Sequence, residues 1–273
     1  MNLSHTFRRS LLTLVLSVVA VSAFAQTTQT AKPFEPQSGQ AGKDVVWVPT
    51  PQALVDKMLD MANVTPQDFV IDLGSGDGRT VITAAKRGAR AMGIEYDPDM
   101  VALSQKNAGD QGVTDKVTFV KADLFETDFS KATVITMFLL PSINIRLRLK
   151  ILDMKPGTRI VSNAFDMEDW QPDEDFTIPN CNQWCKALFW IVPAKVAGSW
   201  RLQQGDLTLT QTFQNLSGTL GSTPITNAKM RGDQITFQAG GAQYTGRVNG
   251  ENMTGTSTSG GNKSNWQATR TRR

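Results

Sequence analysis

Histidine is almost absent from this sequence. His5 is the only histidine among 273 residues, so the body of the chain has no imidazole. Imidazole is the commonest general base in enzymes and a frequent metal ligand. The sequence therefore argues against histidine-based catalysis. Because only two cysteines accompany it, we also expect no metal site.

Long apolar runs are missing too, except at the very start. Arg8 and Arg9 precede an apolar run over 11–24, which ends in a small-x-small triplet at 23–25. These features are typical of a secretory signal peptide. We therefore expect residues 1–25 to be cleaved after Ala25, the protein to be exported to the periplasm, and no stable membrane span to remain. An uncleaved anchor is the alternative, although the run is short for a spanning helix.

Two export routes fit this start. Residues 7–12 partly resemble a twin-arginine signal, whose route carries folded proteins with their ligands aboard. The general secretory route is the other, and there Arg8 and Arg9 only supply positive charge. The first route would explain how a cytosolic ligand accompanies an exported protein.

Neither sign of charge is in marked excess. The chain has 28 basic and 25 acidic residues, and loss of Arg8 and Arg9 with the signal leaves 26 basic residues against 25 acidic. Nucleic-acid-binding domains usually carry a basic surplus. We therefore expect no nucleic-acid partner, and the oligomeric state stays open.

Cys181 and Cys185, four residues apart, are the only cysteines. In an exported protein such a pair predicts a disulfide. Because the closed loop is so short, the bond should contribute about 2 kcal/mol or less to stability.

The most informative stretch runs over 70–79, with the sequence VIDLGSGDGR. An apolar run ends in an acid, turns on alternating glycines and leads into a helix-compatible segment, as in nucleotide-binding α/β proteins. The spacing Gly-x-Gly-x-Gly differs from the pyrophosphate motif, and Asp72 and Asp77 would repel a phosphate. The loop instead suits a ligand with positive charge, such as the amino and sulfonium groups of S-adenosylmethionine. A tight turn without a ligand is the alternative.

Two more acids follow the next two expected strands. Glu95 ends a strand over 89–95, where a carboxylate can accept hydrogen bonds from both ribose hydroxyls of an adenosine. Asp123 follows a strand that begins at Lys116, where an adenine amino group could donate to it. Three acids at one edge of a parallel sheet predict an adenosylmethionine site.

Residues 43–195 resemble a class I S-adenosylmethionine-dependent methyltransferase. Within that class they resemble bacterial relatives of the seven-strand lysine methyltransferases that modify the ATP synthase c-subunit. The segments that carry the resemblance are Val48–Pro51, Asp72–Arg79, Gly93–Glu95, Asp123–Phe125 and Phe138–Pro141.

The resemblance implies S-adenosylmethionine as cofactor and a set of residues that bind it. Trp47 and Thr50 would contact its methionine end, although Trp47 could equally be a core aromatic. The full set implied is Trp47, Thr50, Asp72, Gly74, Ser75, Gly76, Asp77, Gly78, Glu95, Tyr96, Asp123 and Leu124.

The expected fold is α/β, with a doubly wound, Rossmann-like seven-strand methyltransferase sheet followed by a small antiparallel β domain. A flexible linker over 26–44 would precede the methyltransferase domain at 45–196. Its first helix should be capped by Thr50, with Pro51 at the first helical position. A hairpin over 173–195 would close the sheet.

The acceptor is expected at the end of the apolar strand 134–140. Many relatives that methylate an exocyclic amine of a base carry Asn- or Asp-Pro-Pro-aromatic there, and this chain has Leu139-Leu140-Pro141-Ser142 instead. This departure favours a lysine acceptor. The candidates for an acceptor channel are Leu140, Pro141, Phe165 and Trp170, with core packing as the alternative for the two aromatics.

From Gly198 the composition changes to Gly, Ser, Thr, Asn and Gln with alternating apolar residues. This pattern predicts an antiparallel barrel or curled sheet of six to eight strands over 197–273. It could be a docking or ligand-binding module or a structural appendage.

Two functions are weighed. The first is S-adenosylmethionine-dependent N-methylation of a protein lysine or a similar amine. The second is an exported binding protein whose methyltransferase fold is catalytically silent. The intact acids and glycines speak for cofactor binding in both.

Overall fold

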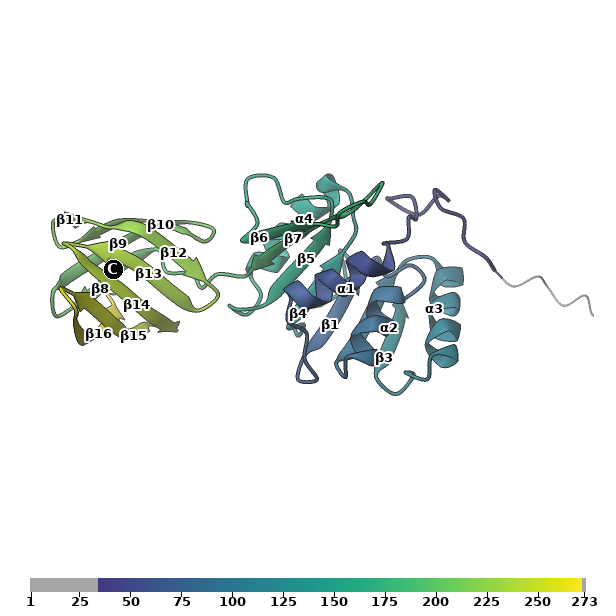
Figure 1. Ribbon diagram of the computed structural model, residues 1–273, viewed down its shortest axis with the longest axis horizontal. Coiled ribbons are helices and arrows are strands. Elements are labelled where there is room, and N and C mark those ends of the chain that lie inside the picture. Colours follow the sequence, from purple (N-terminus) through teal and green to yellow (C-terminus); the bar gives the residue numbers. More distant parts are fainter. Residues whose placement is uncertain (1–33, 272–273) are drawn as a thin grey trace, which may run out of the picture. The chain divides into compact units, whose positions relative to one another are not determined.

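The computed structural model describes residues 34–271, so the expected signal peptide at 1–25 lies outside the described residues. Within this range the chain forms a seven-stranded sheet with four helices, followed by a nine-stranded sheet (Figure 1). No helix of the described part is long and apolar enough to cross a membrane.

The first sheet has the order β3-β2-β1-β4-β5-β7-β6. Its first five strands run parallel, and β7 and β6 form the antiparallel hairpin that closes it. This confirms the expected seven-strand methyltransferase sheet. The strands are β1 (Phe69–Leu73), β2 (Arg90–Glu95), β3 (Val117–Lys121), β4 (Val134–Met137), β5 (Arg159–Asn163), β6 (Glu174–Thr177) and β7 (Lys186–Ile191).

Helices cover both faces of this sheet. Val70 of β1 packs with Leu54 of α1 and Val81 of α2 on one face, whereas the next residue, Ile71, packs with Leu147 of α4 on the other. Burial on both faces explains why the central strands are continuously apolar. The helices are α1 (Gln52–Met61), α2 (Arg79–Lys86), α3 (Pro98–Asp110) and α4 (Pro141–Leu152).

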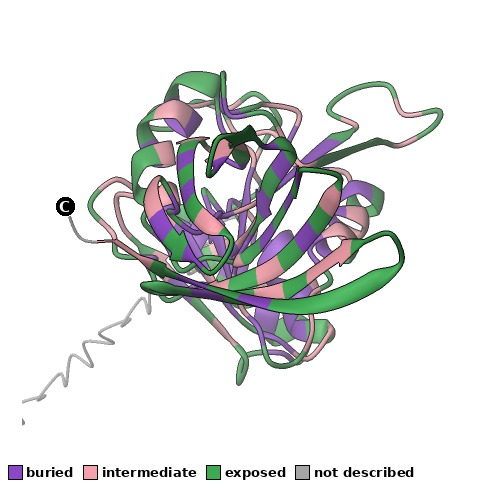
Figure 2. Cartoon of the chain, turned by 90° about the vertical axis from the view of Figure 1, so that its left-hand side faces the viewer, coloured by how far each residue is buried: buried purple, intermediate pink, exposed green. Residues whose placement is uncertain are grey.

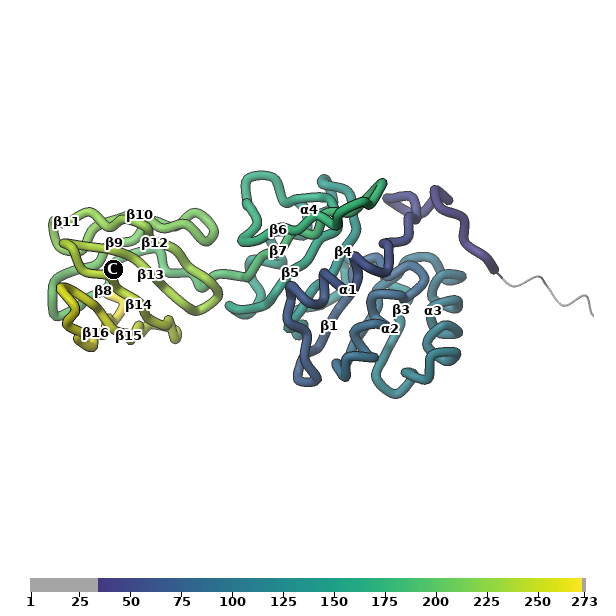
Figure 3. Tube along the Cα trace, viewed as in Figure 1, coloured from purple at the N-terminus to yellow at the C-terminus, as the bar shows by residue number. Residues whose placement is uncertain are grey.

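The segment from 34 to 51 forms no helix or strand and leads into α1 (Figure 3). The expectation that Thr50 caps α1 is wrong: Pro51 is the N-cap residue, and no side chain caps the helix. The Thr50 hydroxyl instead accepts a hydrogen bond of 3.3 Å from Nδ2 of Asn163, at the end of β5. A contact distant in sequence has replaced the local one.

The nine-stranded sheet closes on itself, because β9 pairs with both β8 and β10. Eight strands form the ring, and the two-residue β11 pairs with β10 beside it. Of the two expected forms, a small barrel or a curled sheet, the structure shows the barrel, with nine strands where six to eight were expected. The strands are β8 (Gly198–Leu202), β9 (Gly205–Thr212), β10 (Asn215–Leu220), β11 (Thr223–Pro224), β12 (Thr226–Arg231), β13 (Gln234–Ala239), β14 (Ala242–Asn249), β15 (Asn252–Ser259) and β16 (Asn262–Arg270).

Side chains fill the barrel interior. Buried and exposed residues alternate along its strands (Figure 2). The rings of Phe237 and Tyr244 stack at 4.5 Å, and the ring of Trp266 meets both edge-on. A Cβ at Gly246 would lie 2.5 Å from Cζ2 of Trp266, so glycine makes room for the indole. The alternation seen in the sequence therefore corresponds to a packed core.

Candidate active site

A pocket lies at the carboxyl edge of the first sheet, where the ends of β1, β2 and β4 meet the segment before α1. In open α/β sheets ligands bind at this edge. Eleven of the twelve residues expected around a cofactor line it, namely Trp47, Thr50, Asp72, Gly74, Ser75, Gly76, Asp77, Glu95, Tyr96, Asp123 and Leu124.

Gly78, the twelfth, is not among the lining residues. It precedes α2 with a φ of +82°, and a Cβ there would lie 2.7 Å from Cβ of Ser104 and 2.8 Å from the ring of Phe119. Gly78 therefore serves the turn and the packing of α2, not the pocket wall. Sequence alone could not separate this use of glycine from direct approach to a ligand.

The backbone at Gly76 passes directly under an indole. Its φ is +52°, and a Cβ built there would lie 2.5 Å from Nε1 of Trp47. Gly93 of β2 makes similar room, since a Cβ would lie 2.4 Å from Oγ of Ser75. At both positions glycine therefore makes room for a neighbouring side chain, Trp47 above Gly76 and Ser75 beside Gly93.

Asp72 is the buried acid of the pocket. Its carboxylate accepts a hydrogen bond of 2.6 Å from the Thr136 hydroxyl on the neighbouring strand. Burial raises the pKa of Asp72 to about 7, and the negative charges of Glu95 and Asp77 add to this rise. A cation bound beside Asp72 would favour its charged form. The site is therefore electrostatically suited to a positively charged ligand.

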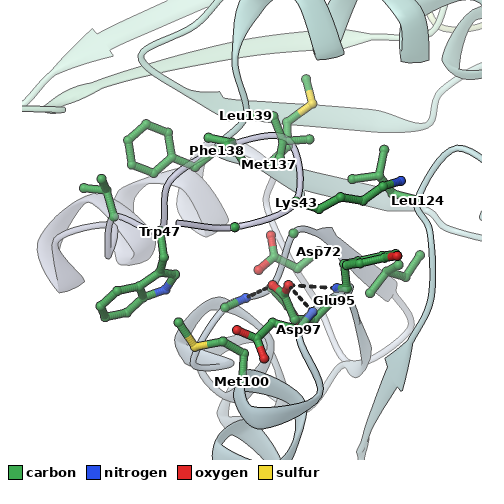
Figure 4. Close-up of a pocket in the computed structure, with 18 of the residues that line it drawn as sticks. Lys43, Trp47, Asp72, Glu95, Asp97, Met100, Leu124, Met137, Phe138 and Leu139 are labelled. Atoms are coloured by element: carbon green, nitrogen blue, oxygen red, sulfur yellow. Dashed lines mark hydrogen bonds between the residues drawn. The ribbon is translucent and has the colours of Figure 1, made fainter. Parts of the chain in front are cut away.

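Glu95 holds the glycine loop to the end of β2. One carboxylate oxygen accepts from the backbone N–H of Gly76 at 2.8 Å, and the other accepts from Tyr96 and Asp97 at 2.7 and 3.0 Å (Figure 4). A carboxylate can accept about four hydrogen bonds. Glu95 therefore shapes the loop and keeps capacity for a ligand hydroxyl.

Asp123 has a partner that the sequence did not suggest. Nζ of Lys43 lies 2.5 Å from Oδ2 of Asp123 and 4.8 Å from the ring centre of Tyr96. The hydrogen bond from Lys43 holds the pKa of Asp123 below its usual value. Residues 40–44, expected to belong to a flexible linker, therefore line the pocket.

Asp77 is neutralised by a neighbour. Nε of Arg79 donates to Oδ1 of Asp77 at 3.0 Å, and Nη1 donates to the backbone oxygen of Thr50 at 2.9 Å. Arg79 therefore ties the glycine loop to the segment before α1. The role expected for Asp77, a contact with a cationic ligand, is shared with this internal ion pair.

The four residues expected to line an acceptor channel differ in their burial and contacts. Phe165 is half-buried and stacks on Phe138, with ring centres 6.0 Å apart. Leu140 is exposed, and Pro141 begins α4. Trp170, however, is fully buried, with its ring 6.2 Å from that of Trp190. The expectation that Trp170 lines an acceptor channel is wrong, because its indole belongs to the core beneath α4.

Sequence reasoning missed several residues of this region. Lys43, Phe138 and Leu139 line the pocket, and Trp184 contacts the Phe138 and Phe165 rings. Phe138 lay within the matched segment 138–141, so its motif could have revealed it. Lys43 and Trp184 carry no local pattern.

The comparisons with known proteins bear on this pocket. A family model described as "ANTKMT methyltransferase domain" matches residues 72–174. A protein-lysine N-methyltransferase of Saccharolobus islandicus (strain REY15A) is 43% identical over 141 residues, which cover 50% of this chain and 88% of that protein. The chain belongs to this methyltransferase family.

Two further relatives of this methyltransferase differ in the substrate they are named for. A lysine N-methyltransferase of Xenopus laevis, named for the ATP synthase c-subunit, is 33% identical over 48% of this chain and 58% of its own length. A solved RNA methyltransferase from Salinibacter ruber, in complex with S-adenosyl-L-homocysteine, is 46% identical, with a TM-score of 0.52. The match covers 55% of this chain and 96% of that one.

The cofactor of this methyltransferase is S-adenosylmethionine, whose demethylated product occupies the Salinibacter structure. The pocket fits it in two ways. Among the described residues Oγ of Ser75 is buried there without a hydrogen-bond partner, and the neighbouring charges that raise the pKa of Asp72 are the negative ones of Glu95 and Asp77. Buried polar groups of this kind are normally satisfied. The alternative of a catalytically silent binding protein gains no support from these relatives.

Proposed function

We propose that this methyltransferase N-methylates a lysine side chain of a protein. The observation that carries this proposal is the aromatic and apolar wall formed by Trp47, Phe138 and Leu139 at the pocket. Figure 4 draws Trp47 and Phe138 on one side and Glu95 and Leu124 on the other. A flexible alkylamine can reach along such a wall, whereas a planar base amine needs flanking amide and carbonyl groups to hold it.

The cofactor, when bound, supplies an electrophilic methyl group on a sulfonium. Asp72 would hold its positive end, Glu95 its ribose hydroxyls, and the Gly74–Gly76 backbone would allow close approach. The Asp123 carboxylate would accept a hydrogen bond from the adenine amino group, in addition to the one it accepts from Lys43. If the acceptor amine enters the site uncharged, no side chain has to remove a proton from it before its nitrogen attacks the methyl group.

The acceptor must therefore be deprotonated by its surroundings. Apolar walls disfavour the charged form of an amine and lower its pKa. Alignment of the acceptor nitrogen with the methyl group then supplies most of the rate, as is general for reactions between bound partners. Trp47 and Phe138 are positioned to provide the apolar walls.

Methylation of RNA is the second candidate, because the Salinibacter relative is named for it. The basic residues of α4 would be the natural phosphate contacts, but they are engaged within the chain. Arg148 pairs with Asp169, Lys150 donates to the backbone oxygen of Phe125, and Arg146 lies over the Phe125 ring. This engagement favours the protein substrate.

The proposal is tested with purified protein, tritiated S-adenosylmethionine and two separate acceptor pools, an extract of soluble proteins and total RNA. We expect label in protein that is recovered as methylated lysine after hydrolysis. Label in nucleosides would establish the RNA function instead. Asp72→Ala is the control, since it should abolish labelling of either pool.

The proposal includes export. Residues 1–25 would act as the signal and be cleaved after Ala25, leaving a periplasmic protein with no membrane span. In support, Cys181 and Cys185 form a disulfide, as the sequence predicted. Structural disulfides persist in oxidising compartments. N-terminal sequencing of protein from the periplasmic fraction should begin at Gln26, and recovery of the intact chain from the cytoplasm would contradict export.

The export route can be tested separately. Replacing Arg8 and Arg9 by lysine keeps the charge but removes the guanidinium groups. If the folded route operates, this variant stays in the cytoplasm. Unchanged export would assign the general secretory route.

A further inference from the structure

Three aromatic side chains meet beside the pocket, each from a different part of the chain. Phe138 follows β4, Phe165 follows β5, and Trp184 lies in the loop between β6 and β7. Their ring centres are 6.0 Å (Phe138–Phe165), 5.6 Å (Phe138–Trp184) and 5.4 Å (Phe165–Trp184) apart. We name these three residues the aromatic cluster.

Trp184 is held in an unusual conformation. Its φ is +55°, a left-handed value that is uncommon for a bulky residue. The disulfide between Cys181 and Cys185 closes the loop immediately around it. Trp184 as a residue is nevertheless 38% exposed, so burial in the core does not account for the strained backbone. Backbone strain of this kind concentrates at functional sites.

The backbone at Phe165 is also held in a defined conformation. Ala164, just before it, also has a left-handed φ of +62°. The backbone oxygen of Phe165 accepts hydrogen bonds from the Ser162 hydroxyl at 2.6 Å and from Nδ2 of Asn144 at 3.2 Å. Both donors belong to buried residues. The backbone that carries two of the three rings is therefore held in defined, left-handed turns, at Ala164 before Phe165 and at Trp184 itself.

Phe138 connects the aromatic cluster to the cofactor pocket, because it lines that pocket and contacts both other rings. We propose that the aromatic cluster is the acceptor subsite and that Trp184, held by the Cys181–Cys185 disulfide, sets its specificity for an alkylamine. This inference rests on the proposed lysine function.

The chemistry of the aromatic cluster suits both ends of the reaction. Its rings remove water from the carbon stem of the acceptor and favour the neutral amine, which can attack a methyl group. The product is a methylated ammonium, and aromatic faces attract such cations. A bare phosphate or carboxylate would gain nothing from this surface, so the subsite selects amines.

The experiment uses Nα-acetyl-lysine methylamide as acceptor and compares its KM among variants. Trp184→Ala is expected to raise KM about tenfold, the scale of losing a contact that buries about two methylene groups of the acceptor stem, while the affinity for S-adenosylhomocysteine stays unchanged. Trp184→Phe should recover most of the loss. The double variant Cys181→Ser, Cys185→Ser should raise KM with the indole still present, because the loop no longer fixes it.

Phe176→Ala is the matched control. Phe176 is a similarly exposed aromatic on β6 of the same hairpin, and its ring contacts Lys57 of α1 instead of the aromatic cluster. Its removal should leave KM unchanged. If Trp184→Ala also left KM unchanged in an enzyme that methylates the acceptor, the inference would be overturned and the lysine function would stand.

A binding measurement separates the inference from the proposed function. Nα-acetyl-Nε-trimethyl-lysine methylamide is titrated into wild-type protein while the indole N–H resonances are followed, with Trp184 assigned by its loss in Trp184→Phe. A saturable shift of the Trp184 resonance supports the subsite even if wild-type protein methylates no lysine. Absence of a shift overturns the inference.

Discussion

Asp72 and Thr136 are register partners on β1 and β4, and the Thr136 hydroxyl donates a hydrogen bond of 2.6 Å to the carboxylate of Asp72, which lines the cofactor pocket. Both residues are buried. Hydrogen bonds from Thr136 and Thr80 favour the ionised carboxylate, but they do not offset burial, and the pKa of Asp72 rises to about 7. The charge state of this residue therefore depends on pH in the neutral range.

The first prediction is that cofactor affinity depends on pH through Asp72. A cationic ligand stabilises the ionised carboxylate, so binding must expel a proton below pH 7. Affinity should fall toward tenfold per unit as pH drops below the pKa of about 7. Calorimetry in two buffers of different ionisation enthalpy would show proton release at pH 6 that becomes smaller as pH rises to 7. In Asp72→Asn both the pH dependence and the proton release should vanish.

The same shift predicts how the ligand-free protein responds to pH. The protonated carboxyl is favoured in the folded state, so its contribution to stability is present below the unfolded value of 3.8 and is lost as pH rises through about 7. Thermal unfolding of ligand-free protein should therefore occur at a lower temperature at pH 8 than at pH 6. In Asp72→Asn the difference in unfolding temperature between pH 6 and pH 8 should be smaller. If the difference were the same as in the wild type, groups other than Asp72 would be responsible for it.

A third prediction concerns the other two strand-end acids. Glu95→Ala should weaken cofactor binding about tenfold or more, because it removes a charge-assisted hydrogen bond worth about 1.5–3 kcal/mol. Asp123→Ala should also weaken binding, because the adenine amino group loses its acceptor. Glu95→Ala should also loosen the glycine loop, since three backbone N–H groups lose their acceptor. The thermal shift produced by S-adenosylhomocysteine reports both. Asp110→Ala, an exposed acid on α3, should not change it.

The fourth prediction uses the contact between Gly76 and Trp47. In Gly76→Ala the new Cβ would lie 2.5 Å from Nε1 of the indole, at a φ of +52° that alanine adopts poorly. The variant should fold less stably by about 1–3 kcal/mol and bind cofactor weakly. Gly109→Ala, on α3 with nothing within 4 Å of the new Cβ, is the control and should not destabilise. If Gly76→Ala and Gly109→Ala had the same stability and cofactor affinity, the close contact between Gly76 and Trp47 would be refuted.

The fifth prediction concerns the proposed domain boundary. The lining residues of the pocket end at Ile143, and the closing strand β7 ends at Ile191. Residues 26–196 should therefore fold and bind S-adenosylhomocysteine without the barrel at 197–273. A soluble fragment without affinity would show that the barrel completes the site.

Much of the site could be predicted because its signals are local. The glycines at 74, 76 and 78 and the acids at the strand ends follow from short motifs, and the alternation in the barrel follows from its period of two. The barrel's closure could not be read from this pattern, because it depends on which strands pair. β9 pairs with β10 as well as β8, and this makes the sheet a ring.

The predictions fail where contacts between residues that are distant in the sequence determine the position of a side chain. Trp170 follows β5 as an acceptor-channel residue would, but its ring enters the core against Trp190. Trp184 looks like an ordinary loop residue and reaches Phe138 only through the fold. Thr50 has the local sequence of a helix cap, yet its hydroxyl bonds Asn163. None of these outcomes is encoded by neighbours in the chain.

The most direct test of the central claim is a calorimetric titration of residues 26–273 with S-adenosylmethionine, alongside the triple variant Asp72→Ala, Glu95→Ala, Asp123→Ala. We predict one site per chain in the wild type and no measurable binding in the triple variant, with circular dichroism showing that the variant is folded. Undiminished binding in the folded triple variant, or no binding by the wild type, would contradict the cofactor site at the carboxyl edge of the sheet.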